Sequence, residues 1–147
     1  MILHRQVDSL LRASIPWSYS IDIWNVGCMI WNFFEGGSLF TGHDHEFQAY
    51  RSRAHLAEMI GLLGQPPASL LARGRQRQKF FLDSGEFRGK SLLKEPTPLE
   101  QRETVLGGQD RESFLRFMRR MLQWEPEKRS TAKELAEDEW IRKHIDL

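Results

Sequence analysis

The chain of 147 residues predicts an all-α fold, with about five helices around one buried central helix. Three observations support this class. Residues 20–35 are apolar around nearly the whole helical circumference, as in a helix packed on several sides. Residues 50–63 and 110–122 place apolar side chains at a spacing of three to four. No stretch of any length alternates apolar and polar residues as a strand would.

The predicted central helix has clear ends. Ser20-Ile21-Asp22 offers capping oxygens at its start, and Gly36-Gly37 ends it. Its apolar residues are Ile21, Ile23, Trp24, Val26, Cys28, Met29, Ile30, Trp31, Phe33 and Phe34.

The segment that follows is predicted to alternate loops with helix. Residues 36–47 form a loop that carries His43 and His45, and a second helix covers 50–63 up to Gly64-Gln65-Pro66-Pro67. A short amphipathic turn at 68–71 precedes residues 73–79, which hold four basic residues and no acid. We interpret this basic run as a solvated loop, because no aromatic residue is interleaved with it for base stacking. Binding of phosphate or an acidic partner is the alternative.

The last third predicts three helices. Thr97-Pro98-Leu99-Glu100 combines a capping Thr, Pro at the first helical position and Glu three residues on, which indicates a helix that ends at Gly107-Gly108. The helix over 110–122 ends at Trp124-Glu125-Pro126. A second capping box, Thr131 to Glu134, opens a final helix through Glu137, after which Trp140 and Ile141 pack against the core.

Composition excludes several classes of protein. Hydrophobic residues make up 40% and charged residues 28%, and 21 basic against 20 acidic residues leave a net charge of +1. This balance is typical of a soluble globular protein and removes the electrostatic argument for nucleic-acid or membrane partners. The amino terminus has no signal-peptide pattern, and the apolar run 26–34 is too short to span a bilayer, so we expect an intracellular protein of the cytoplasm or nucleus.

Metal and thiol chemistry are not expected either. Cys28 is the sole cysteine, which excludes an intramolecular disulfide and a Cys-rich zinc site, and it lies in the most apolar helix as a core residue. His43 and His45 have no second pair of ligands nearby in the sequence.

Two blocks of sequence resemble protein kinases. Asp22-Ile23-Trp24-Asn25-Val26-Gly27 is similar to the D-x-W-x-x-G pattern that opens the central helix of the kinase large lobe. Leu122 to Leu135 resembles L-x-x-[DE]-P-x-x-R-x-[ST]-A-x-E-L, the signature that closes kinase domains. The two blocks occur in the family's order, with a Gly36-Gly37-Ser38-Leu39-Phe40 turn between them.

Finer features resemble the SR-protein kinase branch, especially its fungal members. They are Pro16-Trp17-Ser18-Tyr19-Ser20, the run His55 to Gly64, and Lys79-Phe80-Phe81 with Gly85 and Phe87. The resemblance implies that residues 15–147 are a partial kinase domain, from the end of the activation segment to the carboxyl terminus. Residues 1–14 form a lead-in without a family match.

The resemblance also implies what these 147 residues lack. Phosphoryl transfer in the family uses Mg-ATP, a glycine-rich loop, a Lys on the third strand, a catalytic-loop Asp and Asn, and the Asp of D-F-G. None of these motifs is present, and His4-Arg5-Gln6 replaces the catalytic Asp with Gln, which cannot act as a carboxylate base. We therefore expect no catalytic, cofactor-binding or metal-binding residue. The family's structural positions are Asp22, Trp24, Gly27 and Arg129.

Two of these positions have altered surroundings. Asp22 holds the catalytic loop in the family, and without that loop we interpret it as a helix cap. Arg129 pairs with the Glu of the A-P-E tripeptide in the family. That tripeptide aligns with Asp8-Ser9-Leu10 here, so we expect Arg129 to turn to solvent, backbone carbonyls or another acid.

Partners are expected to be proteins. A central helix that has lost its family cover should expose some of Ile23, Trp24, Met29, Ile30 and Trp31, which favours self-association or binding of a complementary kinase segment. Docking of Arg/Ser-rich substrates is not expected, because the family's acid before His55 is Ala54 here, preceded by Arg53, and only Glu58 remains.

Three hypotheses stay open: a serine/threonine kinase by descent, a catalytically dead remnant that acts as a binding or scaffold module, and a truncated gene model. The coding DNA upstream of Met1 discriminates among them. The sequence identifies no substrate, pathway or oligomeric state.

Overall fold

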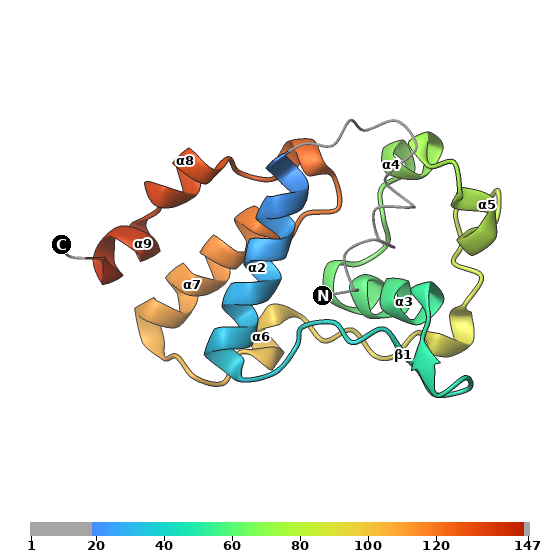
Figure 1. The fold of residues 1–147 in the computed structure, drawn as a ribbon, viewed down its shortest axis with the longest axis horizontal. Coiled ribbons are helices and arrows are strands. Elements are labelled where there is room, and N and C mark those ends of the chain that lie inside the picture. The colour runs from blue at the N-terminus through green and yellow to red at the C-terminus, as the bar shows by residue number, and fades with distance from the viewer. Residues whose placement is uncertain (1–18, 146–147) are drawn as a thin grey trace. The chain divides into compact units, whose positions relative to one another are not determined.

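Helices account for most of the residues in the computed structural model, which describes residues 19–145 (Figure 1). In that range the pairing of strands is limited to β1 (His43–Asp44) and β2 (Ala49–Tyr50), which are antiparallel with His43 opposite Tyr50. The all-α prediction is therefore confirmed, with one short hairpin added. The described residues divide into two compact units, one formed by 40–98 and the other by 19–39 with 99–145.

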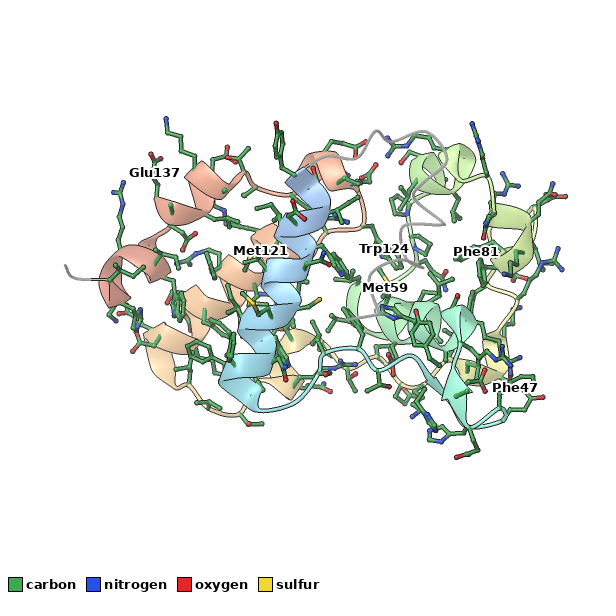
Figure 2. All side chains as sticks on the ribbon, viewed as in Figure 1. Phe47, Met59, Phe81, Met121, Trp124 and Glu137 are labelled. Carbon is green, nitrogen blue, oxygen red and sulfur yellow. The ribbon has the colours of Figure 1, made fainter. Side chains whose placement is uncertain are left out.

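The second unit is built on two helices that pack along each other. α2 (Tyr19–Glu35) lies beside α7 (Gly108–Met121), and Figure 2 labels Met121, which is fully buried at this contact. An aromatic cluster fills the core next to it. The ring of Phe114 lies 4.8 Å from Phe34 and 5.1 Å from Trp140 between centroids. These contacts make α2 and α7 the frame of the unit.

The ends of α2 agree with the sequence prediction, but its burial does not. The backbone amide of Gly36, at φ +67°, donates to the carbonyl of Asn32 and ends the helix. Val26, Met29 and Phe33 are 37%, 51% and 79% exposed, so the helix is not packed on all sides. Of the five residues considered for an exposed patch, Met29 is exposed and Ile30 is half-buried, whereas Ile23, Trp24 and Trp31 are buried.

The helix expected between Thr97 and Gly107 is much shorter than predicted. α6 covers only Leu99–Arg102. The carboxylate of Glu103 accepts hydrogen bonds from the amides of Val105 at 2.8 Å and Leu106 at 2.5 Å. Those amides would otherwise bond to helical carbonyls, so this side chain stops the helix after one turn.

The carboxyl-terminal helices begin at side-chain caps. A 3₁₀ turn, η2 (Pro126–Lys128), leads to α8 (Ala132–Ala136), whose Thr131–Glu134 capping box is formed as predicted. The sequence prediction missed α9 (Glu139–His144). Asp138 caps it by accepting from the amide of Trp140 at 2.9 Å, and Trp140 is buried, as expected.

The first unit is organised around α3 (Ser52–Leu63), whose Leu56 and Met59 are buried. α4 (Ala68–Arg73), α5 (Arg77–Phe80) and the 3₁₀ turn η1 (Lys90–Leu92) follow it along the chain. The basic run was expected to be a loop, but it contains α5. The buried rings of Phe80, Phe81 and Phe87 anchor this region.

Candidate functional site

The first candidate site is the contact between the start of α2 and the segment that carries Arg129. The guanidinium of Arg129 lies over the ring of Trp24, 5.0 Å from its centroid. It donates to the carbonyls of Ser20 at 2.7 Å and Gln123 at 3.0 Å. Sequence reasoning offered backbone carbonyls as one destination for Arg129, and the structure places it there. Arg129 thus ties the first turn of α2 to the chain that follows α7.

Gly27 allows the same two segments to approach closely. A Cβ atom on Gly27 would lie 3.1 Å from Cβ of Met121 and 3.3 Å from a methyl of Leu122, both of which are buried. Those distances are tighter than ordinary packing contacts, so a larger residue at this position would require its neighbours on α7 and Leu122 to shift by a few tenths of an ångström. Three of the four family positions, Trp24, Gly27 and Arg129, therefore lie at contacts between α2 and the chain from the end of α7 to Arg129.

We predict that Gly27→Ala lowers the stability of the chain by about 1–2 kcal/mol, because overpacking outweighs the helical preference for alanine. Gly61→Ala in α3 is the matched control, since a Cβ there meets nothing within 4 Å. It should stabilise the chain by about 0.5–1 kcal/mol. Urea denaturation of both variants measures the difference. Equal effects would show that close packing at Gly27 is unimportant.

The fourth family position, Asp22, does not act as a cap. It lies within the first turn of α2 and is exposed. The positive end of the helix dipole at this position favours a carboxylate.

Cys28, in the same helix, is mostly covered. Burial raises the pKa of its thiol to about 12, although the positive charge of Arg129 acts in the opposite direction. The thiol therefore stays protonated at neutral pH and has little nucleophilic character.

The second candidate site is the region that corresponds to substrate docking in the SR-protein kinase resemblance. Glu58 of α3 accepts from the Thr41 amide at 2.7 Å, the Thr41 hydroxyl at 2.6 Å and the Gly42 amide at 2.8 Å. Its carboxylate therefore pins the chain that precedes β1. The one acid that remained for recognition of basic peptides is already engaged by the protein itself.

A second acid in this region is neutralised as well. Asp44 is fully buried and accepts from Nε of Arg53 at 2.6 Å, and Arg53 also pairs with Glu46. The hydrogen bond from Arg53 holds the pKa of Asp44 below its ordinary value, against the effect of desolvation. This ion pair fastens the β1–β2 hairpin to α3.

His43 of β1 and His45 in the turn that follows it have ring centroids 4.9 Å apart, in an edge-to-face arrangement. Within the described residues, no three His, Cys, Asp or Glu side chains are grouped as a metal site requires. The pair contributes a surface contact between two exposed rings.

Glu103 is the buried charged residue that sequence reasoning missed. It is only 4% exposed, and besides the two amides it accepts from Nε of Arg111 at 2.8 Å. Burial raises the pKa of this carboxyl, but the hydrogen bonds from Leu106, Val105 and Arg111 outweigh burial, so its pKa lies below the ordinary value. The signal in the sequence was an acid four residues before the Gly107-Gly108 pair, with an arginine eight residues after the acid.

Three sequence predictions fall on residues outside the described range: the His4-Arg5-Gln6 match, the Asp8-Ser9-Leu10 register and the Pro16-Trp17 pair. Within that range, no helix is both long and apolar enough to cross a lipid bilayer.

Comparison with known families agrees with this geometry. The protein kinase domain matches residues 9–141, which include α2, α7 and the Arg129 contact. The chain therefore belongs to the protein kinase family.

Several relatives are serine/threonine kinases. The chain is 39% identical over 144 residues to a serine/threonine protein kinase of Aspergillus fumigatus, which covers 95% of this chain and 34% of the relative. It is 32% identical over 150 residues to the serine/threonine-protein kinase SKY1 of Saccharomyces cerevisiae, covering 98% and 19%. It is 30% identical over 131 residues to the serine/threonine-protein kinase SRPK of Physarum polycephalum, covering 85% and 30%. The chain thus spans between a fifth and a third of the length of these relatives.

Proposed function

We propose that this chain forms the helical carboxyl-terminal part of a serine/threonine kinase of the SR-protein kinase type, and that these 147 residues alone do not transfer phosphate. The observation that carries the proposal is the contact of Arg129 with Trp24 and Ser20, formed by residues at the family's own positions. The family's phosphate, metal and base ligands have no counterpart in the sequence.

A phosphotransfer assay tests this proposal. The full chain is incubated with Mg-ATP and an Arg/Ser-rich peptide, and incorporated phosphate is compared with a reaction without protein. We expect equal incorporation in the two reactions. Phosphate incorporation that rises with protein concentration, and that stays with the chain when contaminating proteins are removed, would contradict the proposal.

Recognition of the peptide is a separate part of the proposal. Glu58 is held by Thr41 and Gly42, and Asp44 by Arg53, which leaves neither carboxylate available for arginine side chains of a substrate. The chain is therefore expected not to retain an Arg/Ser-rich peptide.

A binding or scaffold module is the second candidate function. The apolar face of α2 formed by Val26, Met29 and Phe33 supports it, because these three residues recur at helical spacing and are exposed. A second copy of the chain or a complementary kinase segment would cover this face. Self-association is tested by comparing the sedimentation of the wild type with that of Met29→Gln/Phe33→Gln. The control is Val105→Gln, which changes an exposed apolar residue outside α2. A monomeric wild type would exclude the second copy.

The hypothesis of a truncated gene model is addressed by the coding DNA upstream of Met1. An in-frame glycine-rich loop, strand Lys, H-R-D and D-F-G there would favour it, and their absence beside a stable transcript would favour the scaffold module.

A further inference from the structure

The chain is nearly neutral as a whole, but its residues 73–90 form a strongly basic segment. Residues 73–90 hold six Lys and Arg residues and two acids, a net charge of +4 against +1 for the whole chain. Four of these cations are exposed, and one of the four, Lys90, pairs with Glu86. We refer to the other three, Arg75, Lys79 and Arg88, as the basic surface. Figure 2 shows nitrogen-tipped side chains projecting outward around α4 and α5, near the labelled Phe81.

The basic surface is held on a fixed scaffold. Phe81 and Phe87 are buried, their backbones form an antiparallel bridge, and their ring centroids lie 5.5 Å apart. The turn between them uses Gly85 at φ +86°. The amide of Arg88 donates to the carbonyl of Phe80 at 2.8 Å. Lys79 therefore projects from α5 and Arg88 from the end of an ordered hairpin, whereas Arg75 lies in the turn before α5. Fixed positions of this kind lower the entropy cost of binding a ligand.

Arg88 is oriented by its own side chain as well. Its Nε donates to the carbonyl of Gln78 at 2.9 Å and to that of Phe81 at 3.3 Å. A guanidinium has five N–H donors, and these bonds use the one at Nε, so four N–H donors remain on the terminal nitrogens. They present the planar fork that binds phosphate or carboxylate with two parallel hydrogen bonds.

The cations of the basic surface lack acidic partners in residues 19–145. The two acids of the segment pair elsewhere, Asp83 with Arg77 and Glu86 with Lys90. Lys79 lies over the ring of Phe80 at 5.2 Å, and neither Arg75 nor Arg88 forms an ion pair with a described residue. Between residues 75 and 88, three positive charges therefore have no ion pair with a described residue, and an anionic partner would relieve their mutual repulsion.

The residues around the basic surface indicate which class of anionic ligand it fits. The aromatic residues of the segment, Phe80, Phe81 and Phe87, are buried, so no ring is available for stacking nucleic-acid bases. None of the large apolar residues exposed in the described chain lies within residues 73–90, so an amphipathic membrane contact has no apolar side there.

We propose that the basic surface docks an acidic or phosphorylated segment of a partner protein. The shared chemistry is anionic oxygen, from phosphoryl groups or from carboxylates, bound by the fixed fork of Arg88 and the flanking charges of Arg75 and Lys79. This interaction requires no phosphoryl transfer by the chain and does not depend on the function proposed above.

Fluorescence anisotropy of the full chain tests the inference with three labelled 12-residue peptides: one rich in phosphoserine, the same peptide without phosphate, and one with Glu in place of phosphoserine. We expect binding of the first and third and not of the second. A higher affinity for the first assigns phosphoryl recognition, and equal affinities assign carboxylate recognition. Arg75→Gln/Lys79→Gln should weaken binding about tenfold.

The matched control is Lys133→Gln/Arg142→Gln, which removes the same charge from two exposed cations of the other unit and should change affinity less than twofold. Arg88→Lys keeps the charge but loses the fork, and it should weaken the phosphopeptide more than the Glu peptide. The proposal would be overturned if both double variants lost the same amount of peptide affinity, or if the chain bound none of the peptides. It would also be overturned if a 12-nucleotide RNA or anionic vesicles bound more tightly than the peptides. Thermal melts of each variant verify that it is folded.

Discussion

Replacement of Arg129 by leucine should lower the free energy of unfolding by about 3 kcal/mol. Arg129 is only 8% exposed and donates to the carbonyls of Ser20 and Gln123, which would lose these charged donors in the variant. A leucine also loses the contact of the guanidinium with the ring of Trp24. Because one of these carbonyls belongs to α2 and the other follows α7, the loss would loosen the frame of the second unit.

Urea denaturation followed by circular dichroism measures this effect. Arg129→Lys keeps the charge but not the several fixed donors, so it should lose more than half as much stability as Arg129→Leu. The control is Arg119→Leu, at an exposed residue that pairs with Glu100, and it should change stability by less than about 1 kcal/mol. If Arg129→Leu and Arg119→Leu have the same effect, the contact of Arg129 does not hold the unit together.

The second large effect is expected at Glu103. Glu103→Ala should cost about 2–4 kcal/mol, because it strips the amides of Val105 and Leu106 and the guanidinium of Arg111 of their acceptor. Glu112→Ala, at an exposed acid of α7, is the control and should change stability by less than about 0.5 kcal/mol. Thermal denaturation of the three proteins at pH 7 gives the comparison.

The contribution of Glu103 should depend on pH with a definite sign. Its pKa in the folded chain lies below its ordinary value, so the folded state binds the proton more weakly than the unfolded state does. The stability it contributes is therefore fully present above the unfolded pKa of about 4.3 and is lost as the pH falls through the lower folded pKa. The difference in stability between wild type and Glu103→Gln should shrink between pH 6 and pH 3. A difference that stays constant would contradict the pKa shift.

The sequence predicted those elements whose ends depend on local signals. Gly36 ends α2 with a left-handed backbone, and Thr131 and Glu134 form their capping box within four residues, so neither needs tertiary information. The family blocks also marked Trp24, Gly27 and Arg129 as structural positions, and each of them lies at a contact of α2. The hydrogen bond from Arg129 to Ser20 spans more than 100 residues of sequence, and no helical pattern indicated it.

The errors have a common physical origin in side chains that compete for backbone groups. Glu103 takes two amides and stops α6, although the pattern from Thr97 favours a longer helix. Asp138 caps α9 only three residues after α8, and a periodicity search does not separate such short helices. The exposure of Val26 and Phe33 was missed for a different reason, since an apolar pattern does not state which apolar face has a partner.

The central claim is that this chain has the helical framework of the protein kinase family without a nucleotide site. Isothermal titration calorimetry of the full chain with ATP in the presence and absence of Mg²⁺ tests it most directly. The account predicts no saturable heat up to millimolar nucleotide, with or without the metal, while circular dichroism shows a folded helical protein. Micromolar binding that requires Mg²⁺ would contradict it.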